Sequence, residues 1–479
     1  MAYIIQNLLK KNFKSEEASA IASKSREDMT EQIEGLLMEC DFSVASTDSF
    51  LDTFGENPMF LALALQRLDE LAAEQLEDEL WKKKPDFEPF RCIDSLNSQD
   101  NRKETGILIL PRYACIWEGK SRERNHLNDI NTLLKHSHYI KTESGKIDGI
   151  YTVKNYILNP TYFALCMNAQ NELFLPIAVS PLADWVVMKD IKYCHRKKGV
   201  DVNYFMVEEL DEEVQKELSV YIEKVMRKSD KNGDKILVFP EMLGTKKTKQ
   251  MIIEQIRKEN FENLHFIVFP SIWEKNGKHK NHNISYILDY EGNEWFGQEK
   301  LKRFPWEEGE ETFLEDIVEG KELHIVHCEG YGSIAVAICR SELDQDTRNL
   351  LMQKLNVKLI LCPSWTQGSH EFESSIMTGT ERSCNVAWCN TCSALKECNK
   401  QGRTVGIITS FGKNRDYSKL SLDGCKFPEA DCQSACKDGC LFSKKIYGTS
   451  YNELRRKDGE SNGWEGECID VIWGETINI

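Results

Sequence analysis

Short runs of β-forming residues, separated by helical stretches, are the feature of this sequence that most constrains its fold. They lie at 236–239, 266–269, 284–288, 334–338, 359–361, 386–388, 405–409 and 471–473. Apolar periodicity predicts one helix over 209–226, before the first run, and another over 344–355, between two later runs. Strands that alternate with helices in this way favour layered α/β packing.

The connections indicate that the sheets are mixed. Residues 290–294 (Tyr-Glu-Gly-Asn-Glu) lie between two extended runs and have the composition of a hairpin turn. A hairpin joins antiparallel neighbours, whereas a helical crossover joins parallel ones. We therefore expect mixed sheets rather than a purely parallel sheet.

The amino-terminal part is organised differently. Residues 1–95 show helical periodicity, best seen in the apolar run 60–65, and predict a small helical domain. Lys82-Lys83-Lys84-Pro85 ends that pattern, and a polar stretch follows at 95–105. Residues 96–185 contain short apolar runs but show no recognisable group of catalytic residues, so their fold is left unassigned. The remaining domain would span 186–479.

Length and charge exclude some classes of function. The chain has 479 residues, with 61 basic and 77 acidic side chains, and its formal charge of −16 disfavours a protein whose whole surface binds nucleic acid. No run approaches the roughly 20 apolar residues of a membrane-spanning helix, and the first residues lack the features of a signal peptide. We expect a cytoplasmic protein that does not bind membranes, with its 17 cysteines reduced.

Three of the predicted strands end in residues that carry chemistry. Glu241 follows the run 236–239 through Pro240, Lys300 follows the hairpin, and Cys339 ends the run 334–338. Each signal is weak alone: a glutamate often begins a loop, a lysine in a charge run usually faces solvent, and a buried cysteine is mostly inert. Polar residues at the carboxyl ends of strands are nevertheless where α/β proteins usually build their sites.

Taken in order, these motifs resemble the nitrilase, or carbon–nitrogen hydrolase, superfamily. The resemblance implies an α-β-β-α sandwich in which Glu241, Lys300 and Cys339 are the catalytic triad. The Gly309-Glu310 pair resembles the position of a second, supporting glutamate, and the strand leading to Trp365 resembles one beside the family's pocket. Trp365 and Arg340 are therefore candidate substrate-binding residues. The family commonly forms oligomers, which implies at least a dimer here.

The sequence also departs from the family pattern next to the nucleophile. Arg340 and Ser341 follow Cys339, where most members have an aromatic residue and then an aspartate, and Gln298 stands where tyrosine is frequent. These changes predict a reshaped pocket.

The residue types suit a thiol amidohydrolase that cleaves a small amide or nitrile. A thiol with a pKa near its usual ~8.5 is mostly protonated at neutral pH, so it needs a base, for which Glu241 is the candidate. Lys300 would stabilise the oxyanion. Two alternatives stay open: a sensor or assembly platform that has lost turnover, or an enzyme that transfers the acyl group or ammonia. The amino-terminal domain is a candidate for binding a protein partner.

The cysteine-rich segment permits a metal site as an alternative. Cys425, Cys432, Cys436 and Cys440 cluster there, and 389–392 adds a Cys-x-x-Cys. Their spacing does not match the paired ligands of common zinc sites, so reduced thiols are favoured. We expect no metal and no cofactor.

Overall fold

The computed structural model describes most of the predicted α/β region and part of the amino-terminal region. The described residues are 1–11, 29, 31–33, 35, 50–52, 55, 57–77, 90–92, 105–113, 115–117, 130–131, 133–134, 136–159, 162–182, 186, 192–196, 202–207, 209–259, 261–275, 281–381, 384–397, 403–410, 421–427, 439–450 and 472–473.

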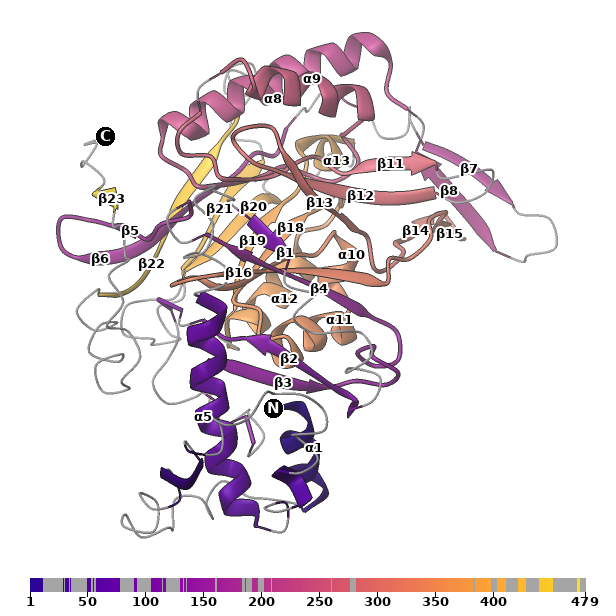
Figure 1. Cartoon of the computed structure of the whole chain (residues 1–479). Coiled ribbons are helices and arrows are strands. Elements are labelled where there is room, and N and C mark those ends of the chain that lie inside the picture. The colour runs from indigo at the N-terminus through magenta and orange to yellow at the C-terminus, as the bar shows by residue number, and fades with distance from the viewer. Residues whose placement is uncertain are drawn as a thin grey trace.

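Two large mixed sheets form the centre of the molecule (Figure 1). The first has the order β1 (Phe90–Cys92), β4 (Thr152–Leu158), β16 (Glu322–Cys328), β17 (Gly332–Val336), β18 (Leu359–Pro363), β19 (Asn385–Cys389), β20 (Arg403–Ser410) and β21 (Ser421–Phe427). The second has the order β11 (Ile272–Lys275), β12 (Asn281–Leu288), β10 (Phe266–Val268), β9 (Ile236–Val238), β6 (Glu172–Val179), β5 (Cys166–Met167) and β23 (Ile472–Trp473). In addition, β13 (Glu294–Glu299) pairs with β12, and β22 (Phe442–Ser450) pairs with β6.

Helices cover both sheets, which completes four layers. Helices α8 (Glu212–Lys231) and α9 (Lys246–Ile256) pack on the second sheet, where Leu237 joins their core. On the same strand, Ile236 and Val238 point into the core between the sheets, as strand alternation requires. Helices α10 (Arg340–Leu343), α11 (Gln345–Asn349) and α12 (His370–Glu381), with the π-turn Leu350–Lys354, lie against the first sheet, where Phe372 stacks on Trp388.

The predicted α-β-β-α sandwich with mixed sheets is therefore confirmed. Each predicted β run overlaps an observed strand, the helix predicted over 209–226 corresponds to α8, and residues 290–294 lie in the turn between antiparallel β12 and β13. No helix within the described ranges combines the length and apolarity needed to cross a membrane.

The amino-terminal helices share a core with the segment that follows them. Helices α1 (Ala2–Lys10) and α5 (Pro58–Glu77) contribute Ile5 and Leu61 to a cluster that also contains Ile107 and Tyr139 of the hairpin β2 (Ile107–Pro111) and β3 (Ser137–Lys141). Strands β4 and β6, from the region left unassigned, lie inside the two large sheets. The domain boundaries at 95 and 185 stay predictions, and the structure shows that elements on both sides of them share cores and sheets.

A small third sheet lies beside the sandwich, to the right in Figure 1. Its order is β14 (Pro305–Glu308), β15 (Glu311–Glu315), β8 (Asn203–Val207) and β7 (Lys192–Arg196). The hairpin β14–β15 begins five residues after Lys300, so this sheet is connected directly to the predicted site.

Candidate active site

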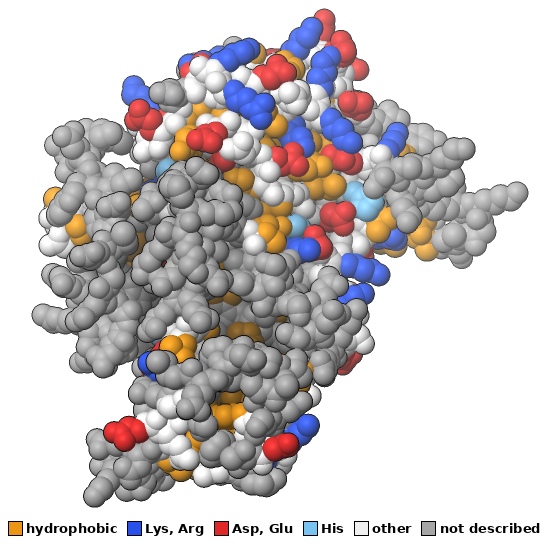
Figure 2. Space-filling view, in the orientation of Figure 1, with side chains coloured by type: hydrophobic (Ala, Val, Ile, Leu, Met, Phe, Trp, Pro, Cys, Tyr) orange, Lys and Arg blue, Asp and Glu red, His pale blue; other side chains and the backbone are white. Residues whose placement is uncertain are grey.

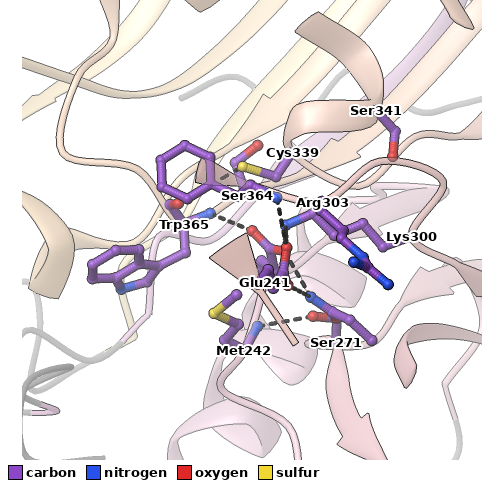
Figure 3. Close-up of polar contacts among 12 residues, drawn as sticks. Glu241, Met242, Ser271, Lys300, Arg303, Cys339, Ser341, Ser364 and Trp365 are labelled. Atoms are coloured by element: carbon purple, nitrogen blue, oxygen red, sulfur yellow. Dashed lines mark hydrogen bonds and ion pairs between the residues drawn. The ribbon is translucent and has the colours of Figure 1, made fainter. Parts of the chain in front are cut away.

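Glu241 lies at the carboxyl end of β9, where Pro240 ends the buried strand. Its side chain is fully buried, and both carboxylate oxygens are fixed by donors (Figure 3). Oε1 accepts hydrogen bonds from Lys300 Nζ at 2.7 Å and Asn283 Nδ2 at 2.8 Å, and Oε2 accepts one from the Trp365 backbone N–H at 3.0 Å. Burial raises the pKa of Glu241, with the negative charge of Glu315 adding to the rise and Lys300 opposing it.

Lys300 follows β13 and is enclosed by carboxylates from two directions. Its ammonium lies 2.7 Å from Glu241 Oε1 and 2.7 Å from Glu315 Oε2, and the three side chains are fully buried. The backbone is fixed as well, because Lys300 N–H donates to the Asn283 carbonyl at 2.8 Å. Burial alone would lower the pKa of Lys300, but the two carboxylates outweigh it and raise that pKa, so the side chain is an ammonium at neutral pH.

The second carboxylate on Lys300 comes from Glu315 and not from Glu310, so the predicted supporting residue is corrected. Glu310 is exposed in the turn between β14 and β15, whereas β15 returns to the site and ends at the buried Glu315. Glu315 also accepts hydrogen bonds from Asn283 Nδ2 at 3.1 Å and the Phe304 N–H at 3.0 Å. The hairpin places the Gly-Glu pair at its tip, five residues before the carboxylate that contacts the lysine.

Cys339 is held in a strained backbone conformation between β17 and α10. Its φ is 46° and its ψ is −108°, a region that a residue with a Cβ adopts at a cost of about 1–3 kcal/mol. The Cys339 N–H donates to the Pro363 carbonyl at 2.9 Å, and Sγ donates to the Trp365 carbonyl at 3.7 Å. Burial raises the pKa of this thiol, and the negative charge of Glu241 raises it further. The resting thiol is therefore protonated and requires a base.

Trp365 connects the base and the nucleophile through its backbone. It follows β18, is 4% exposed, donates its N–H to Glu241 and accepts from the Cys339 thiol with its carbonyl. Arg340 is half-buried at the first residue of α10, next to the nucleophile. The structure thus brings Glu241, Lys300, Cys339 and Trp365 together, while a role for Arg340 in binding substrate stays a prediction.

Three further residues build the site, and the sequence assigned a role in it to none of them. The amide of Asn283 bridges Glu241 and Glu315. Glu315 was overlooked because the Gly-Glu motif drew attention to Glu310. Ser341 is buried and its Oγ accepts from the Leu301 N–H at 2.9 Å, which joins the segment after the lysine to the nucleophile helix. Because β12 (NHNISYIL) contains several polar residues, its sequence does not single out Asn283.

The cysteine-rich segment lies only partly within the described residues. Among them, no group of three or more His, Cys, Asp or Glu side chains could hold a metal ion. Cys389, Cys392 and Cys440 are buried. Cys432 and Cys436 lie outside the described residues, so the prediction that this segment binds no metal stays a prediction.

Comparisons with known proteins give structural matches only. No family model and no curated protein matches the sequence. The structure is similar to Nit3 of Saccharomyces cerevisiae, described as a member of branch 10 of the nitrilase superfamily, at 13% identity and a TM-score of 0.38, covering 61% of this chain and 96% of that one. It is also similar to the NitFhit protein of C. elegans, at 13% identity and a TM-score of 0.39, covering 65% of this chain and 69% of that one.

An amidase from Nesterenkonia sp. matches at the same level. The identity is 13% and the TM-score 0.38, and the match covers 60% of this chain and 95% of that one. Nit3 is described as a member of the superfamily that the strand-end motifs resemble, and the Nesterenkonia protein as an amidase. With similarity this low, what the present chain does has to be argued from its own site.

Proposed function

We propose that this chain is a carbon–nitrogen hydrolase that cleaves a small amide or nitrile through a thioester on Cys339. The observation that carries the proposal is the buried Glu241–Lys300–Glu315 cluster, together with the Trp365 backbone that contacts both Glu241 and Cys339. Fully buried charges of this kind are costly for stability alone, and perturbed pKa values in such a cluster are typical of functional sites.

The first half of the reaction uses each group once. As the Cys339 sulfur attacks the amide carbon, its proton passes to Glu241, whose raised pKa makes it a stronger base than an exposed glutamate. The carbonyl oxygen becomes an oxyanion and is stabilised by the Lys300 ammonium. The backbone N–H of Arg340 can assist, since it is at the first residue of α10 and has no acceptor within the helix.

The second half releases both products. Glu241 returns the proton to the leaving nitrogen as the C–N bond breaks, which leaves a thioester on Cys339 and a free amine or ammonia. A water molecule then attacks the thioester, with Glu241 taking its proton and passing it to the departing sulfur. The carboxylic acid leaves and the thiol is restored.

Three activities are separated by analysing the products. Hydrolysis yields the free acid and one equivalent of amine or ammonia, transfer yields a new amide or ammonia passed to a second acceptor, and a sensor binds without forming product. We expect the acid and the amine from the unmodified protein and neither from the Cys339→Ala variant. Binding with no product would favour the sensor, for which the altered residues Arg340 and Ser341 are the sequence argument. The intact buried cluster favours turnover.

We also propose that the chain self-associates in the cytoplasm and that the helices before residue 95 bind a partner. The support is the resemblance to a family of oligomers and the presence of amino-terminal elements outside the two large sheets. Light scattering of the purified chain tests the first part: a mass of at least twice 55.3 kDa is expected, and a monomer at all concentrations contradicts it.

A further inference from the structure

An aromatic cluster separate from the two main cores lies against the candidate active site. Its buried members are Phe205, Val207, Met242, Trp365 and Ala394, and Trp273, Phe304, Trp306 and Phe313 pack on it while staying partly exposed. We call Phe205, Trp306 and Trp365 the aromatic wall. The ring centroids of Trp306 and Trp365 are 5.8 Å apart, and those of Phe205 and Trp306 are 5.6 Å apart in an edge-to-face arrangement.

The aromatic wall is joined to the reacting groups through the backbone. Trp365 contacts Glu241 and Cys339 with its own N–H and carbonyl. Phe304 N–H donates to Glu315, and the Phe304 ring centroid is 6.0 Å from the Lys300 ammonium. A group bound on these rings would therefore lie next to the triad and would be positioned by the same elements.

Two buried donors in this cluster are unused. Within the part of the chain that the structure describes, the indole Nε1 atoms of Trp365 and Trp273 are buried and have no hydrogen-bond partner. A buried donor without an acceptor costs about 1–3 kcal/mol, so an acceptor atom of a ligand would be favoured there. The partly exposed Trp306 and Phe313 place the aromatic wall near the surface. Figure 2 shows hydrophobic side chains on the right of the molecule, the side on which Figure 1 places the small sheet.

The rings of the aromatic wall argue against a negatively charged group in contact with them. Every side chain of the cluster is apolar or aromatic, and the neighbouring ammonium and carboxylates are paired with one another. An anion stacked on the aromatic wall would lose its hydration and face the negative π-faces of the rings. A flat uncharged group would instead stack on the rings, which is worth about 0.5–1.5 kcal/mol per aromatic pair beyond the area that it buries.

We propose that the aromatic wall is the specificity subsite of the enzyme and accepts amides whose non-reacting part is a flat ring without negative charge and with a hydrogen-bond acceptor for Trp365 Nε1. This inference rests on the proposed function, because it takes the neighbouring triad as the reacting centre. It goes beyond that function by naming the class of substrate and the strands, β8 and β14, that select it.

The test measures binding, so that it does not depend on turnover. In the Cys339→Ala background, calorimetry compares phenylacetamide, propionamide, the anion succinamate and the cation β-alaninamide. We expect phenylacetamide to bind at least about tenfold more tightly than the other three. Adding Trp306→Ala should remove at least about tenfold of that affinity and change propionamide binding by less than about twofold. Adding Trp365→Phe, which deletes the indole N–H, should weaken the acceptor-bearing 4-acetylphenylacetamide more than phenylacetamide.

The control is Trp295→Phe, since Trp295 lies at the opposite end of β13 from Lys300 and packs on Phe266. It should leave all affinities unchanged. Should Trp306→Ala unfold the protein, Trp306→Leu keeps a larger apolar side chain than alanine and removes the flat ring. Four outcomes would each overturn the subsite. They are equal affinity for the four amides, tighter binding of either ion, no binding of any amide, and an equal loss of affinity for phenylacetamide and propionamide in the Trp306 variant. A selective subsite with no acylation of Cys339 in the unmodified chain would reject the proposed function instead.

Discussion

The Glu315→Gln substitution tests whether Glu315, and not Glu310, is the carboxylate that supports Lys300. Glu315 is fully buried and lies 2.7 Å from the Lys300 ammonium. Removing one partner of a buried ion pair costs about 3–5 kcal/mol, and because Lys300 keeps Glu241, we expect about 3 kcal/mol less free energy of unfolding. Glu310→Gln is the matched control: in its exposed turn it should change that free energy by less than about 0.5 kcal/mol.

The pH profile separates an electrostatic role of Glu315 from a purely structural one. The negative charge of Glu315 helps to raise the pKa of Glu241, so its removal should lower that pKa and move the acid limb of kcat/KM to lower pH. The rate at the optimum should also fall at least about tenfold, or 1.4 kcal/mol, because one carboxylate no longer holds the lysine. The assay is ammonia release across a pH series, with urea unfolding in parallel.

Two outcomes would refute this reasoning. One is that Glu310→Gln reproduces the loss of rate. The other is that Glu315→Gln leaves both the rate and the acid limb unchanged while the protein stays folded.

Three further predictions follow from the buried polar groups. Lys300→Ala and Glu241→Gln should each lower kcat/KM by at least about 10²-fold. Lys302→Ala removes a half-buried lysine outside the cluster and should not lower it to that extent. An inactive Lys302→Ala variant together with an active Lys300→Ala variant would show that the wrong lysine is assigned. Burial raises the pKa of Glu342 to about 7 despite a hydrogen bond from Ser375. The folded state therefore binds this proton more tightly than the unfolded state. The free energy of unfolding should fall as pH rises from 4.5 to about 7. At about pH 8, Glu342→Gln should therefore stabilise the protein by up to about 3 kcal/mol in urea unfolding, with little effect at about pH 4; equal effects at both would contradict the assignment.

The fold was predictable because the apolar runs are short, regular and buried. Ile236 and Val238 face the core between the sheets while Leu237 faces α8 and α9, so a buried strand of this kind is apolar along its whole length. The middle region was unpredictable because β4 and β6 are separated by more than 50 residues from strands beside them, such as β16 and β9. Pairing over such a distance leaves no local signal.

The site was partly predictable for a similar reason. Glu241, Lys300 and Cys339 each follow a strand closely. Residues at strand ends can be expected to lie near one another even when the conformations of the loops are unknown. Glu315 was missed because its position depends on how the hairpin β14–β15 folds back, which brings the second strand rather than the turn to the lysine. The aromatic wall was missed apart from Trp365, because Phe205 and Trp306 come from strands that pair with the two sides of β15.

The most direct test of the proposed mechanism is the intact mass of the protein after mixing with excess phenylacetamide and quenching in acid. The mechanism predicts a mass increase equal to the acyl group less one hydrogen, mapped to the peptide that contains Cys339, and absent from the Cys339→Ala variant. An adduct on any other residue, or the same adduct in the Cys339→Ala variant, would contradict it, as would release of phenylacetic acid by that variant at the rate of the unmodified protein.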